Sequence, residues 1–509
     1  MIVVFVLVLA ATACLYRIVP KGFIPDTDND QLMVSTEASQ GTSYYLMTEY
    51  QQRIIDIIRQ DPDVESVIAS TGGFFGSGGS NTGRIFVQLR PRRQRALTVN
   101  QVVEKLRPKV SRFPGLRVFM TIPAAIRIGG RPSRSQYDFT LQGPETAELY
   151  RQAPKLERVL AQLPEIQDVS SDLQIRTPRV NIEFDRDKAA ALRLNAVQIE
   201  GALYDAFGPR WSSTIYAPTN QYRVLLEILP QFQEHADYLS LLYFKSSDSQ
   251  MIPLSTFTRL KTDAGPQTIN HNGQLPSVTI SFNLKPGTTL GDAVARVQDL
   301  ALRNLPATIT TSFTGVAREF QSSQKNLGLL LIVAVMVVYI VLGVLYESYV
   351  HPLTILSGLP SAGVGALLTL LIFHVDLNIY AFVGLMMLVG IVKKNAIMQI
   401  DFALDAERRE GKSPSEAVYE GCLIRFRPIM MTTMAALLGT LPISLGWGAG
   451  GESRRPLGLT VVGGLLFSQL ITLYLTPVVY TYMDAIMVRW GKRKRSEAPA
   501  PVVPASERV

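Results

Sequence analysis

The stretch Gly390-Ile-Val-Lys-Lys-Asn-Ala-Ile-Met-Gln-Ile-Asp-Phe-Ala403 places two adjacent lysines in an apolar run that begins near Leu377. A charged side chain near the centre of a bilayer costs about 2.5 to 3.5 kcal/mol on insertion scales, so these lysines need an explanation. Adjacent residues on a helix project about 100° apart, so Lys393 and Lys394 cannot reach the same neighbour. We assign Lys393 to snorkelling toward the membrane interface and expect Lys394 to point into a helix bundle.

Four further segments are as apolar as the one around the lysines. A helix needs about 20 predominantly apolar residues to cross the hydrocarbon core of a membrane. The stretch 21–325 is mixed in composition and is expected to fold outside the bilayer. We expect five transmembrane helices, over residues 327–345, 353–373, 377–400, 429–447 and 457–480.

The first apolar run, residues 1–16, is interpreted as a sixth span that is incomplete at its N-terminus. A signal peptide is the alternative, because Ala11-Thr-Ala-Cys14 resembles a lipoprotein cleavage site, but the run lacks a basic n-region. Lys and Arg gather in the loop 403–427 and the segment 489–495, which predicts that both lie in the cytoplasm. Six spans then put the region 21–325 on the opposite face of the membrane.

Charge and cysteine content exclude two classes of protein. The net charge of +8 needs no nucleic-acid partner, because much of the excess lies in that loop and C-terminal segment. The two cysteines, Cys14 and Cys422, both lie outside the region 21–325, so no disulfide framework is expected there. After Ser496 the sequence is rich in Pro and Ala, which predicts disorder.

The region 21–325 repeats a strand–helix–strand pattern, and such repeats decide the fold. Apolar residues recur at three- and four-residue spacing in the helix 145–163, whereas the strand Val278-Thr-Ile-Ser-Phe282 alternates. Two such units combine into a split βαβ, or ferredoxin-like, sandwich, so four units make two subdomains of an α+β membrane protein. The units cover residues 32–70, 84–121, 137–170 and 278–313. The stretch 185–274 between the last two is too long for a structureless loop and predicts an inserted domain.

Motifs for hydrolysis and for metal binding do not occur in the sequence. Neither GxxxxGKS nor GxxxxGKT is present, and the Gly-rich stretch 72–83 lacks the lysine of a phosphate-binding loop. The histidines His235, His271, His351 and His374 are scattered, without HExxH or Cys/His spacing. The sequence therefore favours a transporter driven by an ion gradient over an enzyme, with no cofactor and no metal site.

A lysine in a helix bundle requires a carboxylate partner. The other predicted spans contain no Asp or Glu, and Asp401 lies two turns along the same helix as Lys394, about 10.5 Å away. The partner is therefore expected in another chain or in a part of the polypeptide outside this sequence. A lysine that exchanges a salt bridge as a carboxylate gains and loses a proton is a known type of proton relay.

Three motifs resemble the C-terminal half of resistance-nodulation-division (RND) multidrug efflux pumps of the hydrophobe/amphiphile class. They are Gly390-Ile-Val-Lys-Lys-Asn-Ala-Ile397, Arg425-Phe-Arg-Pro-Ile-Met-Met-Thr-Thr433 and Phe23-Ile-Pro-Asp26. The stretches 346–355 and 212–222 resemble the Mdt-type members, which form heteromeric pumps. The resemblance implies the seventh to twelfth spans, two porter subdomains, PC1 and PC2, and a docking domain inserted in PC2. It assigns 1–19 to the seventh span, 20–135 to PC1, 136–184 and 275–325 to PC2, 185–274 to the docking domain, 326–484 to five spans and 485–509 to a basic, disordered cytoplasmic tail.

The resemblance also implies the residues of a proton relay. Lys394 matches the relay lysine, Asn395 its neighbour, Thr432 the relay threonine and Arg425 the arginine at the cytoplasmic end of the eleventh span. The family's paired relay aspartates lie in the fourth span, which is not in this sequence.

The stretch 72–83 matches the family's flexible switch loop beside a drug pocket lined with phenylalanine, where glycines permit backbone movement. Phe75 and Phe86 fall on aromatic pocket positions, and Phe74 is an additional aromatic; core packing is the alternative role for Phe86. Ile68 and Gly73 stand where the family has two further aromatics. The loop glycines are Gly72, Gly76, Gly78, Gly79 and Gly83.

The resemblance implies a proton-driven antiporter in the inner membrane of a Gram-negative bacterium. Its partners would be the protomers of a homo- or heterotrimer, an N-terminal half, a periplasmic membrane-fusion adaptor, a TolC-like outer-membrane channel and the lipid bilayer. One alternative is heavy-metal efflux, although the four methionines Met33, Met47, Met120 and Met251 are isolated from one another in the sequence. Another is a translocation accessory resembling SecD/SecF, and a third is a truncated half that does not turn over.

Overall fold

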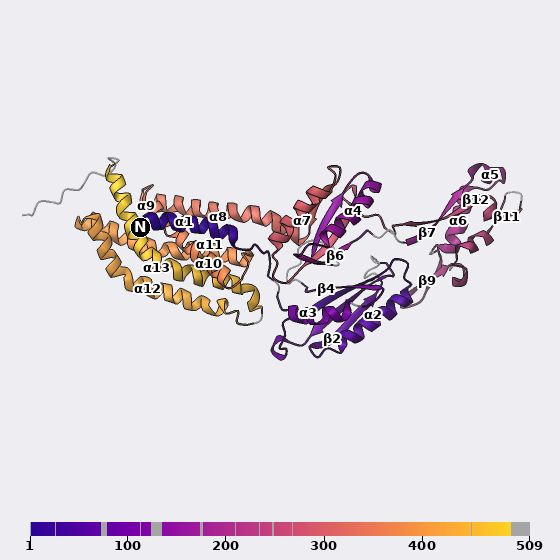
Figure 1. Cartoon of the computed structure of the whole chain (residues 1–509), viewed down its shortest axis with the longest axis horizontal. Coiled ribbons are helices and arrows are strands. Elements are labelled where there is room, and N and C mark those ends of the chain that lie inside the picture. Colours follow the sequence, from indigo (N-terminus) through magenta and orange to yellow (C-terminus); the bar gives the residue numbers. More distant parts are fainter. Residues whose placement is uncertain are drawn as a thin grey trace, which may run out of the picture. The chain divides into compact units, whose positions relative to one another are not determined.

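The computed structural model describes residues 2–25, 27–72, 79–111, 113–123, 135–173, 177–208, 210–233, 235–246, 249–266, 268–448 and 450–489. The chain divides into two compact units, of which the second comprises Ser39–Thr42 and Gln174–Ile269. The first unit holds a helical bundle and two α/β sandwiches (Figure 1).

Five helices of the first unit are long and apolar enough to cross a membrane, and they correspond to the five predicted spans. The apolar helix α1 (Ile2–Ile18) packs beside α10, where Thr12 Oγ1 donates to the Pro360 carbonyl at 3.1 Å. Its 17 residues fall short of the roughly 20 that cross a bilayer, so the sixth span remains a prediction. The five are α8 (Val316–Tyr346), α9 (His351–Leu356) continued by α10 (Leu359–Ile372), α11 (Ile379–Glu410), α12 (Pro414–Ser444) and α13 (Gly451–Arg489).

The first sandwich is a four-stranded antiparallel sheet, in the order β2-β3-β1-β4, covered by two helices. Apolar residues alternate along the strands, so Val34 and Ile85 are fully buried beneath Ile54 and Leu106 of the helices. Its elements are β1 (Gln31–Ala38), α2 (Tyr44–Arg59), β2 (Val64–Thr71), β3 (Thr82–Leu89), α3 (Val99–Val110) and β4 (Leu116–Thr121).

The second sandwich has its own core, which includes Phe139 and Phe282 of the strands and Leu156 and Val297 of the helices. Ala317 and Phe320 at the start of α8 complete this core, so α8 leads directly from the sandwich into the bundle. The sheet order is β13-β14-β5-β15, and β6 also pairs with β14. The elements are β5 (Tyr137–Gln142), α4 (Thr146–Leu160), β6 (Ile166–Ser171), β13 (His271–Asn272), β14 (Leu275–Leu284), α7 (Leu290–Asn304) and β15 (Thr310–Thr314).

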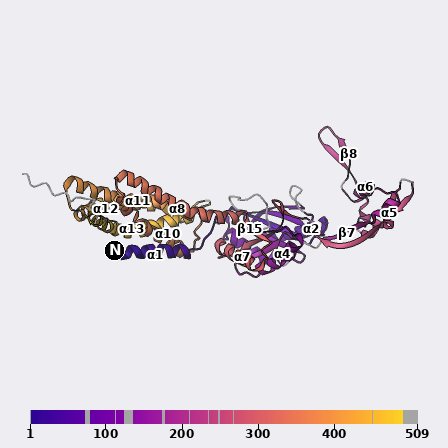
Figure 2. The same ribbon diagram turned by 90° about the horizontal axis from the view of Figure 1, so that it is seen from above.

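The second unit packs short elements around Ile199, Leu254 and Phe257. Its strand β7 (Thr177–Phe184) lies before residue 185, the predicted start of the insert, yet pairs with β12 (Thr258–Gly265) inside this unit. The β8–β9 hairpin extends away from the rest of the unit (Figure 2). The other elements are α5 (Arg186–Ala191), α6 (Ala196–Phe207), β8 (Arg210–Tyr216), β9 (Gln221–Leu226), η3 (Pro230–Phe232), η4 (Ala236–Leu241), β10 (Tyr243–Lys245), β11 (Met251–Pro253) and η5 (Leu254–Thr256).

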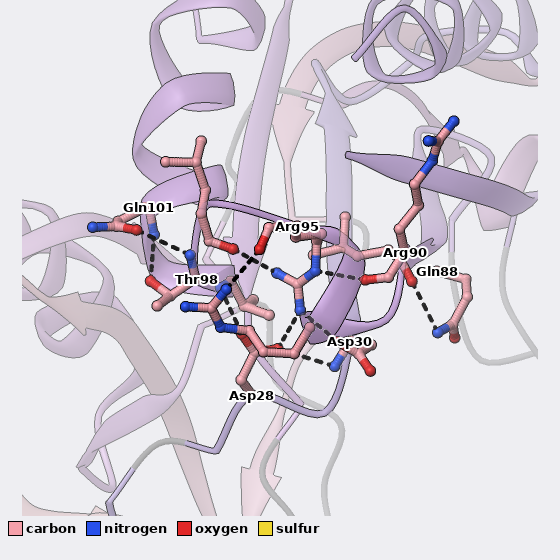
Figure 3. A network of polar contacts seen from close by, with 11 residues as sticks. Asp28, Asp30, Gln88, Arg90, Arg95, Thr98 and Gln101 are labelled. Atoms are coloured by element: carbon pink, nitrogen blue, oxygen red, sulfur yellow. Dashed lines mark hydrogen bonds and ion pairs between the residues drawn. The ribbon is translucent and has the colours of Figure 1, made fainter. Parts of the chain in front are cut away.

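A buried arginine fixes the start of α3 in the first sandwich (Figure 3). The side chain of Arg95 is fully buried, and its Nη2 donates to Asp28 Oδ1 at 2.6 Å and to Asp30 Oδ1 at 2.5 Å. The other oxygen of Asp28 accepts from the amide of Val99 at 3.1 Å, at the first residue of α3. Thr98 closes the helix end in a capping box with Gln101. This network ties α3 to the segment that enters the sheet.

Substitution of Arg95 should destabilise the first sandwich. Arg95→Ala removes the buried cation beside Asp28, whose side chain is 7% exposed, and beside Asp30, which is partly exposed; loss of one partner of a buried pair costs up to about 3 to 5 kcal/mol. The Nε of Arg92, 3.8 Å from Asp28 Oδ2, remains as a weaker contact. The matched control is Arg93→Ala, because Arg93 is exposed in the same loop. Thermal unfolding of the detergent-solubilised chain should show a lower midpoint for Arg95→Ala than for the unsubstituted chain, and an unchanged midpoint for Arg93→Ala. Equal midpoints for the two variants would contradict a structural role for the network.

Candidate functional site

The two lysines of α11 lie in different environments. Lys394 is exposed on the surface of this chain, and Lys393 is half-buried. Within the described residues Lys394 makes no ion pair, and Asp401 instead accepts a hydrogen bond from Tyr346 Oη at 2.5 Å. Lys394 therefore does not point into the bundle formed by the helices of this chain. The predicted position of Lys394 inside a bundle requires helices other than these.

A closed ring of polar side chains lies beside Lys394 in the bundle. The amide nitrogen of Asn395 donates to Thr433 Oγ1 at 3.1 Å and to Gln469 Oε1 at 3.2 Å. The hydroxyl of Thr433 donates to the same Gln469 oxygen at 3.0 Å. Thr433 and Gln469 are both buried, and the three residues belong to α11, α12 and α13. The ring therefore joins three helices through hydrogen bonds that water cannot replace, because water is excluded from the interior of a membrane bundle.

The structure brings Asn395 together with the neighbour of the predicted relay threonine. Thr432 Oγ1 donates to the Ile429 carbonyl of its own helix at 3.2 Å. The Arg425 guanidinium lies 5.7 Å from the ring centroid of Phe402. Gln469 had no role in the sequence analysis, although a glutamine within an apolar membrane helix is a signal of function.

Some of the predicted pocket and switch-loop residues lie outside the described residues. They are the pocket residues Gly73, Phe74 and Phe75 and the switch-loop glycines Gly76 and Gly78. Ile68 of β2 lies directly opposite Phe86 of β3. Phe86 in turn lies opposite Met33 of β1, and Met33 lies opposite Thr121 of β4. Exposed fractions of 72% for Ile68 and 38% for Phe86 rule out core packing for these side chains within this chain. The row Ile68–Phe86–Met33–Thr121, here called the open-face row, crosses the sheet on the side away from the helices.

The ends of the predicted switch loop are fastened by one glutamine. Buried Gln51 donates to the Ser70 carbonyl at 2.9 Å and accepts from Thr71 Oγ1 at 2.6 Å. A Cβ on Gly83 would lie 2.3 Å from the Gln51 side chain, so this position admits glycine alone without rearrangement. Gly72, at the other end, has a φ of +82°, which glycine adopts readily. Gly79 also lies within the described residues, where its carbonyl accepts from the amide of Thr82.

A cavity of about 460 Å³ lies between elements of the two sandwiches. Thr121, the last residue of the open-face row, is part of its wall. Burial raises the pKa of Asp376, another wall residue, and the carboxylate of Asp292 raises it further. The polar wall residues include Gln101, Arg107, Thr121, Gln167, Asn283 and Asp376.

The ring predicts unequal effects for two adjacent threonines. Thr433→Val removes a hydroxyl that both donates and accepts inside the bundle, so it should cost about 1 to 3 kcal/mol. Thr432→Val removes a bond within one helix turn and should change stability by less than about 0.5 kcal/mol. Thermal unfolding of the solubilised chain measures both variants, and Thr433→Ser should restore the midpoint. A larger loss for Thr432→Val would contradict the arrangement.

Comparison with known proteins places these features in a family. The model of the AcrB/AcrD/AcrF family matches residues 1–484. Multidrug resistance protein MdtC of Escherichia coli O157:H7 (strain EC4115 / EHEC) is 44% identical over 489 residues, covering 96% of this chain and 47% of the relative. MdtC of Escherichia fergusonii shows the same identity and coverage. The chain thus spans about half the length of the curated relatives it matches.

Solved structures show a similar fold. Two crystal forms of a heavy metal efflux pump align with a TM-score of 0.84 at 23% identity, covering 95% of this chain and 50% of theirs. At this identity the likeness establishes the fold and nothing about the substrate. The family model covers nearly the whole chain, and the MdtC relatives cover it at 44% identity. The chain therefore belongs to the AcrB/AcrD/AcrF family of resistance-nodulation-division efflux transporters.

Proposed function

We propose that this chain is the C-terminal half of an inner-membrane transporter that exports hydrophobic and amphiphilic compounds in exchange for protons. Members of its family are transporters, not enzymes. The observation that supports proton coupling most directly is Lys394, a lysine in a membrane helix with no ion-pair partner in the described chain. An uncompensated ammonium at that depth is costly, so a carboxylate from outside these residues is expected to pair with it.

In the proposed relay, Lys394 pairs with a carboxylate of the N-terminal half while that carboxylate is ionised and is released when it takes up a proton. Release frees the ammonium to move, because the attraction between the two charges disappears. Asn395 lies beside Lys394 and is held by Thr433 and Gln469. On resemblance alone, we propose Thr432 as the relay threonine and place Arg425 at the cytoplasmic end of the same span.

The open-face row supports a hydrophobic substrate. Phe86, Ile68 and Met33 present apolar surface on a sheet face that no helix of this sandwich covers. Flat apolar contacts discriminate weakly between ligands, which suits a pump for many compounds. Phe75, Phe74 and the glycines of the switch loop are proposed to complete this surface.

A heavy-metal substrate has less support. The solved structures with this fold are of a heavy metal efflux pump, but at 23% identity they speak for the fold alone. Within the described residues no group of three His, Cys, Asp or Glu side chains is arranged to hold a metal ion. The MdtC relatives, at 44% identity, favour the multidrug class.

The proposed assembly includes an N-terminal half, two further protomers, a periplasmic adaptor and an outer-membrane channel, with the two sandwiches and the second unit of this chain in the periplasm. The β8–β9 hairpin supports a partner contact, because Trp211, Ile215 and Tyr216 are 56%, 58% and 75% exposed. Large apolar side chains gathered on one projecting element are typical of an interface. The SecD/SecF-like accessory and the inactive fragment remain the alternatives to be tested.

The relay predicts that Lys394→Ala abolishes efflux in a transporter that joins this chain to an N-terminal half. Lys393→Ala is the matched control and should be much milder, because its side chain is assigned to snorkelling. Dye accumulation in cells, with protein levels checked by immunoblotting, measures both variants. Full efflux by Lys394→Ala, or efflux by this chain alone, would overturn the assignment.

The substrate face predicts unequal effects of Phe86→Ala on different drugs at an unchanged protein level, since each drug makes its own apolar contacts. Phe139→Ala is the comparison, because Phe139 is 1% exposed in the second core and its truncation costs about 3 to 5 kcal/mol. It should lower the protein level and resistance to every drug alike. The same uniform loss for Phe86→Ala would refute its role as a contact residue.

A further inference from the structure

The two sandwiches of the first unit have separate hydrophobic cores. Val34, Ile54 and Leu106 belong to one core, and Phe139 and Phe282 to the other. Bodies with separate cores can change their mutual orientation without exposing either core to water. Polar contacts between the two sandwiches therefore decide how firmly they hold one another.

Arg107 of α3 and Asp168 of β6 form such a contact. Arg107 Nη1 lies 2.7 Å from Asp168 Oδ1 and 2.7 Å from Oδ2, so one donor nitrogen is shared by both carboxylate oxygens. The side chains are 22% and 15% exposed, so water screens the pair only partly. A charge-assisted hydrogen bond of this kind is stronger than a neutral one.

The backbone of β6 is shaped to present Asp168 to the other sandwich. Two residues of β6, Asp168 and Val169, oppose the single residue Phe282 of β14, which makes a β-bulge. The φ of Asp168 is +55°, a conformation that Asp and Asn tolerate better than most residues. A bulge re-aims the side chain that it carries. Asn283 Nδ2 donates to Asp168 Oδ2 at 3.0 Å, so a residue of the same sandwich orients the carboxylate independently of Arg107.

Arg107 is also held in place from its own side. It lies two turns along α3 from the helix end that the Arg95 network and Thr98 stabilise. Its Nε lies 3.9 Å from Glu104 Oε1, one turn earlier on the same helix, which is an ion-pair distance but too long for a hydrogen bond. Both members of the pair are thus attached to the rigid part of their own sandwich.

The pair stands at the wall of the 460 Å³ cavity. Arg107 lines the cavity from the first sandwich, and Gln167 and Asn283, which flank Asp168 in sequence and in space, line it from the second. Separation of Arg107 from Asp168 would move these opposite walls apart. It would also increase the exposure of Thr121, a half-buried residue where the open-face row meets the cavity.

We propose that the Arg107–Asp168 ion pair is a clasp that holds the opposite walls of the cavity between the two sandwiches together and limits access to it. Access rises when the pair opens and falls when it forms. Its consequence for transport rests on the proposed function, because the cavity would then be on the route to the open-face row. Access itself is a property of this chain and can be measured without transport.

The test is the rate at which a maleimide labels a cysteine in the cavity. Thr121→Cys supplies the thiol in a chain carrying Cys14→Ser and Cys422→Ser, and mass spectrometry follows the modification. Arg107→Gln and Asp168→Asn each remove one charge, and Asn suits the positive φ of residue 168. Each should speed labelling about five- to tenfold, as expected for loss of a partly exposed charge-assisted bond.

A double-mutant cycle identifies the pair as the cause. The combined Arg107→Gln and Asp168→Asn variant should label no faster than either single variant, because the second change removes a contact already lost. Arg303→Gln breaks an exposed ion pair with Asp299 inside the second sandwich and should not alter the rate. Unaltered rates in both single variants, or effects that multiply in the double variant, would overturn the clasp. An unaltered thermal midpoint for Asp168→Asn excludes unfolding as the source of faster labelling.

Discussion

Four residues, 20–23, connect the membrane bundle to the second sandwich through their backbone carbonyls. The Phe23 carbonyl accepts from the amide of Ile379 at 3.0 Å, and the Lys21 carbonyl accepts from the amide of Gly291 at 3.1 Å. These amides lie in the first turns of α11 and α7, where helix N–H groups have no partner within their own helix. One short segment thus satisfies the ends of two helices in different parts of the unit. A Cβ on Gly22 would lie 2.9 Å from Asp376, so glycine allows this close approach.

Polar side chains within the bundle, like the N–H groups at the helix ends, need hydrogen-bond partners from the protein, because water is excluded there. The ring of Asn395, Thr433 and Gln469 meets that need and in doing so fixes how α11, α12 and α13 are rotated against one another. Asn395 points into the bundle. The preceding residue, Lys394, projects about 100° away around the helix and lies at the surface of this chain. The lysine that the sequence singled out is therefore positioned by residues to which it makes no bond.

Local patterns predicted both sets of elements. Burial of one face leaves a periodicity that indicated the four strand–helix–strand units, and apolar runs long enough to cross a bilayer indicated the five membrane helices. Contacts between distant segments leave no such pattern. Arg107 and Asp168 are 61 positions apart, and nothing local in either segment indicates the other. Resemblance singled out Asn395 and Thr432 together, yet the hydroxyl that contacts Asn395 belongs to Thr433 and not to Thr432. One step along a helix turns a side chain by about 100°, which only the packed structure resolves.

The bundle and the extramembrane part of the first unit are linked by a stiff element. α11 runs from Ile379 to Glu410 without a proline, whereas α12 and α13 each contain two prolines in their interior. Proline is a common cause of sharp kinks, so α11 is better suited than its neighbours to transmit a displacement along its axis. Lys394 lies fifteen residues from Ile379, or about 22 Å at 1.5 Å per residue. A shift of the lysine on gain or loss of its partner's charge would thus reach Ile379, the carbonyls of residues 20–23 and, through Gly291, the first turn of α7. That turn begins at Leu290, which lines the same cavity as Arg107, so in the proposed relay a movement that starts at Lys394 would end at the cavity wall.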